Sequence, residues 1–195
     1  MNKPLIDIAK NKAAPELDAQ ALALLAVAED LYGPRTSGWE FEGVHFANDA
    51  PRLWSFYETG STVPDFVRIH VTPSVRDNPD QALYQLAHEV IHMLAPTCAP
   101  CTIIFEEGLA VKFSLEQRFQ SDWYAEALRN RRVQGENYHD AWQLAEQFLL
   151  LAPDIKQLRR LEPAFHNWTP AFLVANIPGM DPVFATALCE RRMMR

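Results

Sequence analysis

The sequence predicts an α+β fold, with a small mixed or antiparallel sheet first and a mainly helical region after it. Short runs rich in β-branched and aromatic residues are confined to residues 39–72, whereas apolar residues recur at helical spacing from residue 79 onward. The 195 residues, 48% of them hydrophobic, suffice for one core. We therefore expect a single domain, in which residues 1–110 form the sheet and the motif-bearing helices and residues 111–195 form a helical part.

The first element expected is an amphipathic helix over residues 17–31. Apolar residues repeat there at helical spacing, with Pro15 near the start and Gly33 just past the end. Acidic residues balance the lysines ahead of this stretch, which is not typical of a secretory signal. No apolar run approaches the roughly 20 residues of a membrane span, so we expect a cytoplasmic protein.

Three strands are expected next, at residues 39–47, 53–59 and 66–72, because each run is bounded by turn residues. A helix should then begin near residue 79. Asn78 can cap it, Pro79 suits the first helical position, and Gln81 stands in the capping-box position. Pro96 ends the pattern. The expected core face consists of Leu83, Leu86, Ala87, Val90, Ile91 and Leu94.

His88, Glu89 and His92 on this helix form an HExxH motif outside the apolar face. The spacing of the histidines places both imidazoles on one side of the helix, so that both can bind one metal ion. Glu89 lies beside them and could reach a water molecule on that ion. Two histidines and a carboxylate from a later segment are a recurring ligand set of catalytic zinc.

Glu107 is our candidate for the third ligand. It opens a Glu-Gly-Leu-Ala segment that begins an apolar helix through Val111 and Phe113, which could pack against the first helix. Glu106 is the alternative. Adjacent helical residues point about 100° apart, so only one of the two can face the ion, and the other would support a ligand or face solvent.

Over residues 88–110 the HExxH motif and the later Glu-Gly-Leu-Ala resemble the gluzincin branch of the zincin metallopeptidases. The resemblance implies a zincin-like fold, a Zn²⁺ cofactor and a peptide or protein substrate. It also implies that His88, His92 and Glu107 bind the zinc and that Glu89 is the general base.

Such enzymes usually carry a Tyr or His that donates a hydrogen bond to the developing oxyanion. Tyr138 and His139, at the start of an expected helix over residues 138–151, are the two candidates. By the same analogy, the strand at residues 66–72 is expected to present an edge along which an extended peptide pairs.

Two other functions remain open. The first is a zinc hydrolase of a non-peptide amide, although the glycine- and cysteine-containing ligand segment that deformylase-like enzymes place before HExxH is missing here. The second is a non-catalytic interaction domain on the same fold.

Cys98 and Cys101 form a CxxC pair between the expected ligands. They could form a disulfide, bind a metal or be two ordinary loop cysteines. Cys189 is the only other cysteine, so one chain cannot supply a four-cysteine site.

The net charge of -7 argues against nucleic acid or an anionic membrane surface as a partner. The cluster of Arg129, Arg131 and Arg132 is expected to lie on a solvated helix face. The sequence spacing that is typical of metal ligands is absent at His45, His70 and His166, so we expect these to be surface or core residues.

The remaining chain is expected to be helical near residues 121–133, 138–151, 154–161, 169–176 and 181–193. Thr169 with Pro170, and Asp181 with Pro182, are expected pairs of cap and first helical residue.

Overall fold

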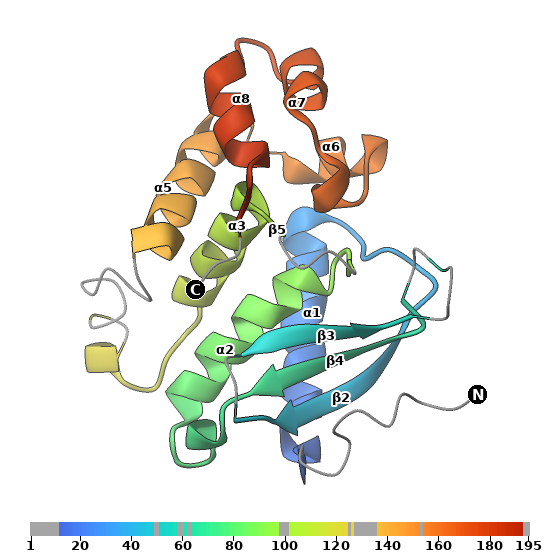
Figure 1. Cartoon of the computed structure of the whole chain (residues 1–195). Coiled ribbons are helices and arrows are strands. Elements are labelled where there is room, and N and C mark those ends of the chain that lie inside the picture. The colour runs from blue at the N-terminus through green and yellow to red at the C-terminus, as the bar shows by residue number, and fades with distance from the viewer. Residues whose placement is uncertain are drawn as a thin grey trace.

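The computed structural model of the chain describes residues 12–48, 51–57, 61, 64–97, 102–124, 126, 136–152 and 154–192 (Figure 1). It confirms a mixed α+β architecture in which the larger strands precede most of the helices. In Figure 1 the sheet lies against α1 and α2, while α6, α7 and α8 lie at the far end of the molecule. Cys98, Cys101 and the three arginines near residue 130 lie outside the described residues.

The main sheet has the order β1-β2-β4-β3. Its strands are β1 (Lys12–Ala13), β2 (Glu40–Phe46), β3 (Arg52–Phe56) and β4 (Phe66–Val71). β4 pairs parallel with β2 and antiparallel with β3, so the sheet is mixed. The three expected strands are thus present, with ends that differ by a few residues.

The expectation that residues 66–72 form a sheet edge is wrong, because β4 lies between β2 and β3. Its residues from Val67 to Val71 are all buried. A strand that is paired on both sides and covered on its faces reads as a continuous buried run. Among the described strands, β3 forms one edge of the sheet and β1 forms the other.

The helix α1 (Asp18–Tyr32) follows a short 3-10 turn, η1 (Pro15–Leu17). The Asp18 carboxylate accepts a 2.7 Å hydrogen bond from the Val44 amide in β2. Gly43 beside it has a φ of 114°, and a Cβ there would lie 3.2 Å from Asp18 Oδ1. At the end of α1 Tyr32 is buried, whereas the adjacent Leu31 is 48% exposed.

The helix α2 (Pro79–His92) follows the 3-10 turn η2 (Pro73–Asp77) and starts where the capping signals predict. The Asn78 side chain accepts a 3.0 Å hydrogen bond from the Gln81 amide. The helix ends before Pro96, which lies beyond the turn that follows. Leu86, Ala87, Val90, Ile91 and Leu94 are buried as expected, and Leu83 is partly buried.

The helix α3 (Ile104–Leu115) follows directly on β5 (Thr102–Ile103). It begins before the expected Glu-Gly-Leu-Ala start and packs against both α2 and α5 (Glu136–Leu151). Gly108 makes the second contact possible. A Cβ at this position would lie 2.0 Å from the Ala141 carbonyl oxygen, so only glycine permits this approach.

The C-terminal part contains α6 (Ile155–Leu161), the 3-10 turn η3 (Phe165–Asn167), α7 (Pro170–Asn176) and α8 (Pro182–Cys189). The Thr169 and Asp181 side chains cap α7 and α8, as expected. The helix expected to reach residue 193 ends at Cys189. The chain then forms β6 (Arg191–Arg192), which pairs antiparallel with β5 and so closes a second, two-stranded sheet. Of the helix expected at residues 121–133, residues 125 and 127–133 lie outside the described part.

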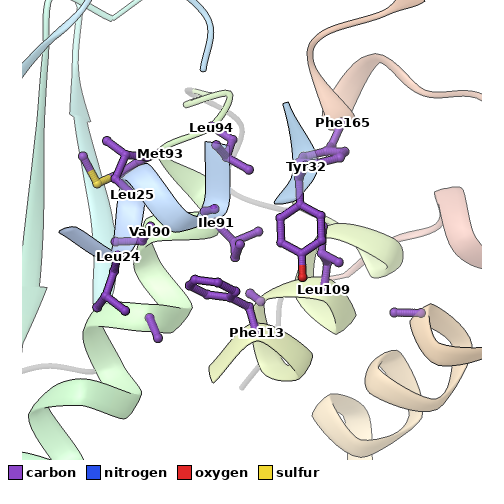
Figure 2. Packing of buried hydrophobic residues seen from close by; sticks show 14 of the residues in the cluster. Leu24, Leu25, Tyr32, Val90, Ile91, Met93, Leu94, Leu109, Phe113 and Phe165 are labelled. Atoms are coloured by element: carbon purple, nitrogen blue, oxygen red, sulfur yellow. The ribbon is translucent and has the colours of Figure 1, made fainter. Parts of the chain in front are cut away.

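One hydrophobic cluster extends from Ala14 to Leu188 and joins the sheet to the helices. Figure 2 shows its centre, where side chains of α1, α2 and α3 meet. The labelled residues are Leu24, Leu25, Tyr32, Val90, Ile91, Met93, Leu94, Leu109, Phe113 and Phe165. None of the helices in the described part of the chain combines the length and apolar content needed to cross a lipid bilayer.

Arg159 of α6 joins the C-terminal ends of α1 and α2 from inside the protein. It is 3% exposed. Its guanidinium donates to the carbonyl oxygens of Tyr32, Gly33, Pro34, Leu94 and Pro163, at 2.7 to 3.2 Å. These acceptors use all the N–H groups of the side chain, and the Tyr32 and Gly33 carbonyls carry the partial negative charge of the end of α1. The end of α2, just after His92, is therefore fixed to the rest of the fold.

Candidate metal centre

One face of α2 carries the polar residues of the site. Asp80, Tyr84, His88 and His92 follow one another at four-residue intervals, which places them along one side of the helix. The apolar residues of α2 occupy the core. All four polar residues are nevertheless buried, with exposed fractions between 3% and 9%. This face of α2 is therefore covered by other parts of the chain.

Glu107 of α3 meets both histidines. Potential ligand atoms of His88, His92 and Glu107 all lie within 4.8 Å of one another. The Oε2 atom of Glu107 is 3.3 Å from His88 Nε2, and its Oε1 atom is 3.8 Å from His92 Nε2. Among the described residues this is the one group of at least three such side chains that could hold a metal ion.

Glu106, the alternative ligand, occupies a different position. Its Oε1 atom lies 2.8 Å from His92 Nδ1, and the residue is 1% exposed. It therefore contacts His92 on the ring nitrogen that does not face Glu107. Such a contact fixes the orientation and tautomer of a metal-binding histidine. The adjacent carboxylates thus have separate places, as the helical geometry requires.

The two oxygens of Glu107 also differ. Thr102 in β5 donates a hydrogen bond from its hydroxyl to Oε1. Oε2 is buried and makes no hydrogen bond, although His88 Nε2 lies near it. A buried carboxylate oxygen without a hydrogen bond is costly unless an ion satisfies it. The set of two imidazoles and one carboxylate fits zinc, for which nitrogen and carboxylate ligands of this kind are usual.

The charges of the site favour a protonated His92 beside an ionised Glu107. Burial alone would lower the pKa of His92, but Glu107, Glu106 and Glu89 raise it to about 10. Burial alone would raise the pKa of Glu107, but His92, His88 and the Thr102 hydroxyl lower it to about 2. Without a metal ion, a proton on His92 thus compensates the negative charge of Glu107. A cation could replace that proton.

Glu89, the expected general base, is 3% exposed. Burial raises its pKa, while His88 and His92 act in the opposite direction. The backbone N–H of Leu53 in β3 donates a hydrogen bond to its carboxylate. Glu89 thus lies in the same electrostatic environment as the three candidate ligands and is connected to the edge strand of the sheet.

The two candidate oxyanion donors lie in different surroundings. The Tyr138 ring packs edge-to-face on the His88 ring, with the centroids 5.9 Å apart. Burial raises the pKa of Tyr138, and Glu107 and Glu89 raise it further, so its hydroxyl stays protonated. His139 instead packs on Trp142, at 5.8 Å, and lies 3.8 Å from Asp140. The structure brings Tyr138 to the candidate ligands and gives His139 other neighbours.

An aromatic cluster adjoins the site along α2. Tyr84, one turn before His88, packs in a group with Val111, Leu115, Phe119, Tyr124, Tyr138 and Trp142. The Asp80 carboxylate accepts hydrogen bonds from the amides of Gln120, at 2.7 Å, and Ser121, at 3.0 Å. Asp80 therefore attaches the segment after α3 to the start of α2.

The sequence patterns did not identify several residues that lie in or beside the site. Asp80 and Tyr84 share the helical spacing of the two histidines, so their place on the same face could have been predicted. Thr102 and Leu53 gave no such signal, because their contacts depend on how separate segments pack. His45 and His70 are opposite each other on β2 and β4, and no metal-binding group forms around them among the described residues.

Comparison of the chain with protein-family models, with curated proteins and with solved structures gave no match.

Proposed function

We propose that this protein is a zinc-dependent hydrolase with a zincin-like architecture that cleaves peptide bonds. The observation that supports this best is the convergence of His88, His92 and Glu107, with ligand atoms within 4.8 Å of one another. Three protein ligands and one open position are typical of catalytic zinc. The buried carboxylate of Glu89 beside them supplies a candidate base.

In this proposal each chain residue has a defined task. Zinc, when bound, supplies a Lewis acid that activates water near neutral pH and polarises the substrate carbonyl. Glu89 takes the proton of the attacking water and passes it to the leaving amine, a contribution of roughly 10² to 10⁴ in rate. The Tyr138 hydroxyl donates a hydrogen bond to the carbonyl oxygen as negative charge develops there.

The surroundings favour an extended substrate. The side chains of His88, His92 and Glu107 are each 11% exposed, which leaves little access for the surface of a folded protein. β3 is an edge strand, and its Leu53 contacts Glu89. An extended peptide could add to such an edge through main-chain hydrogen bonds. We therefore transfer to β3 the pairing role first expected of residues 66–72.

The first test is the zinc content of the protein. We expect elemental analysis of protein purified without a metal-affinity tag to give about one zinc per chain. A His88→Ala, His92→Ala double variant should contain none. Zinc retained by the double variant would point to the cysteines. An absence of zinc from the wild type, even after zinc is added back, would favour the non-catalytic interaction domain.

The second test separates chemistry from metal binding. Glu89→Gln should retain zinc but lose peptide hydrolysis by roughly 10² to 10⁴, because the base is removed while the ligands remain. A peptide library supplies the substrates. Undiminished turnover by Glu89→Gln would contradict the mechanism. If the wild type bound zinc and hydrolysed N-acyl amides but no peptides, the non-peptide amide hydrolase would be the better assignment.

The third test addresses the oxyanion donor. Tyr138→Phe removes only the hydroxyl and should lower kcat by roughly 10² to 10³, the usual cost of losing such a donor. His139→Ala changes the neighbouring residue and is the matched control. It should leave kcat nearly unchanged. The reverse result would transfer the role to His139.

A further inference from the structure

The surroundings of Glu107 distinguish its two carboxylate oxygens. The Thr102 hydroxyl donates to Oε1. Oε2 is buried without a hydrogen bond and is 3.3 Å from His88 Nε2. Oε1 thus has a hydroxyl donor, whereas the neighbour of Oε2 is an imidazole that is itself a candidate metal ligand.

This difference matters because a carboxylate can bind a metal ion through one oxygen or through both. Each oxygen that binds takes up a coordination position. A catalytic zinc site needs a position that stays open for water or substrate. A hydroxyl that donates to Oε1 competes with the ion for the lone pairs of that atom and favours binding through Oε2 alone.

The position of Thr102 is fixed by the end of the described chain. In the β5–β6 ladder Thr102 lies opposite Arg192, and the Ile104 amide donates a 2.9 Å hydrogen bond to the Glu190 carbonyl. Since α3 begins at Ile104, no loop separates the strand that carries Thr102 from the helix that carries Glu107. The hydroxyl and the carboxylate are therefore held at a fixed separation by regular backbone structure.

We propose that Thr102 is a positioning residue that restricts Glu107 to one metal-binding oxygen, Oε2, and that the pairing of β5 with β6 holds its hydroxyl in place. This inference rests on the proposed metal site. Thr102 has no contact with substrate in this role. It acts through Glu107 and keeps one coordination position of the ion open.

A purely structural hydrogen bond makes a different prediction. If the bond between Thr102 and Glu107 only stabilised the fold, its loss would lower the free energy of unfolding and leave the affinity and geometry of the bound metal unchanged. Metal affinity and coordination number therefore separate the two roles.

The experiment compares Thr102→Val with Thr102→Ser. Valine keeps the branched shape that suits a strand but lacks the hydroxyl, whereas serine restores it. Thr186→Val is the matched control, because the Thr186 hydroxyl donates to the Pro182 carbonyl at an exposed place on α8. Zinc affinity is measured by competition with a chromophoric chelator. The absorption spectrum of the Co²⁺-substituted protein reports the coordination number.

We expect Thr102→Val to bind zinc roughly 10- to 100-fold more weakly, the usual effect of removing a group that orients a metal ligand. Its Co²⁺ spectrum should shift towards a higher coordination number as both oxygens of Glu107 bind. Thr102→Ser and Thr186→Val should match the wild type in both measurements. Thr102→Ala provides the same comparison if the valine variant does not fold.

Wild-type zinc affinity and an unchanged Co²⁺ spectrum in Thr102→Val would overturn the inference, even if the metal-free variant were less stable. A wild-type protein that binds neither Zn²⁺ nor Co²⁺ would overturn the metal site itself. Normal metal binding by the wild type without peptide hydrolysis would count against the proposed activity alone.

Discussion

The helices α2 and α3 both carry site residues, but they accommodate polar groups in different ways. On α2 the polar and apolar residues separate onto two faces, with Leu86 and Val90 in the core and His88 and His92 on the site face. Residues 84–92 of α2 and residues 104–111 of α3 are all buried, but on α3 the two carboxylates are adjacent in the sequence and therefore point to different sides of the helix.

Because the two carboxylates of α3 point to different sides, each of them needs a partner of its own. A buried carboxylate is costly unless it is paired. Glu106 is paired with His92, while Glu107 has Thr102 and the two histidines. Two identical neighbours therefore acquire different roles because α3 directs them towards different partners.

The largest expected effect comes from exchanging each α3 carboxylate for its amide. Glu107→Gln should abolish zinc retention, because it removes a charged ligand. Glu106→Gln should keep the ion but weaken its binding roughly 10- to 100-fold, because only the support of His92 is lost. Zinc competition assays measure both variants. Equal losses of affinity would show that the two carboxylates are not divided in this way.

The close packing of α3 is tested by Gly108→Ala. The added Cβ would lie 2.0 Å from the Ala141 carbonyl oxygen, so α3 and α5 must separate. We expect a loss of about 1 to 3 kcal/mol in the free energy of unfolding, the usual cost of overpacking. Urea denaturation of the metal-free protein measures it. An unchanged unfolding midpoint would mean that α5 can shift without cost.

The pKa values of His92 on α2 and Glu107 on α3 predict that protons are released when zinc binds. In the metal-free protein the pKa of His92 is about 10, so the imidazole is protonated at pH 7.5. Coordination must displace the Nε2 proton, because Nδ1 contacts Glu106. The pKa of Glu107, about 2, means that this carboxylate has no proton to lose.

Calorimetry in buffers of different ionisation enthalpy should therefore give at least one proton released per zinc at pH 7.5, because Glu89, whose pKa burial raises, can add to the proton from His92. Zinc affinity should rise about tenfold per pH unit, up to the pKa of His92. Release of no proton would mean that His92 is neutral before the metal binds.

The smallest effect is expected at Asp80, the buried acidic residue at the start of α2. The Asp80 carboxylate accepts hydrogen bonds from the Gln120 and Ser121 amides. Asp80→Asn keeps an acceptor oxygen for one of these amides, but its side-chain NH₂ group faces the other and cannot accept from it. We expect a loss of about 1 kcal/mol in unfolding free energy. Asp181→Asn is the matched control, because Asn caps a helix as well as Asp does. A larger loss in the control would contradict the role given to Asp80.

The predictability of each element follows from the range of the interactions that form it. The start of α2 was correctly predicted because Asn78 and Gln81 interact within one turn of the chain. The place of β4 was predicted wrongly because strand order depends on the parallel pairing of β4 with β2, which no local pattern specifies. The end of α8 was also missed, since β6 exists only through its pairing with the distant β5.

By itself, the sequence determined which residue types could bind a metal and that His88 and His92 would lie on one face of α2. Helical periodicity and capping are local, and they require no knowledge of the rest of the fold. It left open which of Glu106 and Glu107 faces the histidines.

Only the tertiary structure decided that Glu107 meets His88, that Thr102 donates to Oε1 of Glu107, and that β3 is the sheet edge beside Glu89. Each of these facts depends on how separate segments pack against one another. The rotation of α3 relative to α2 is one such quantity. It is set by contacts on several sides of α3, including the close approach to α5 at Gly108, and no periodicity within a single segment encodes it.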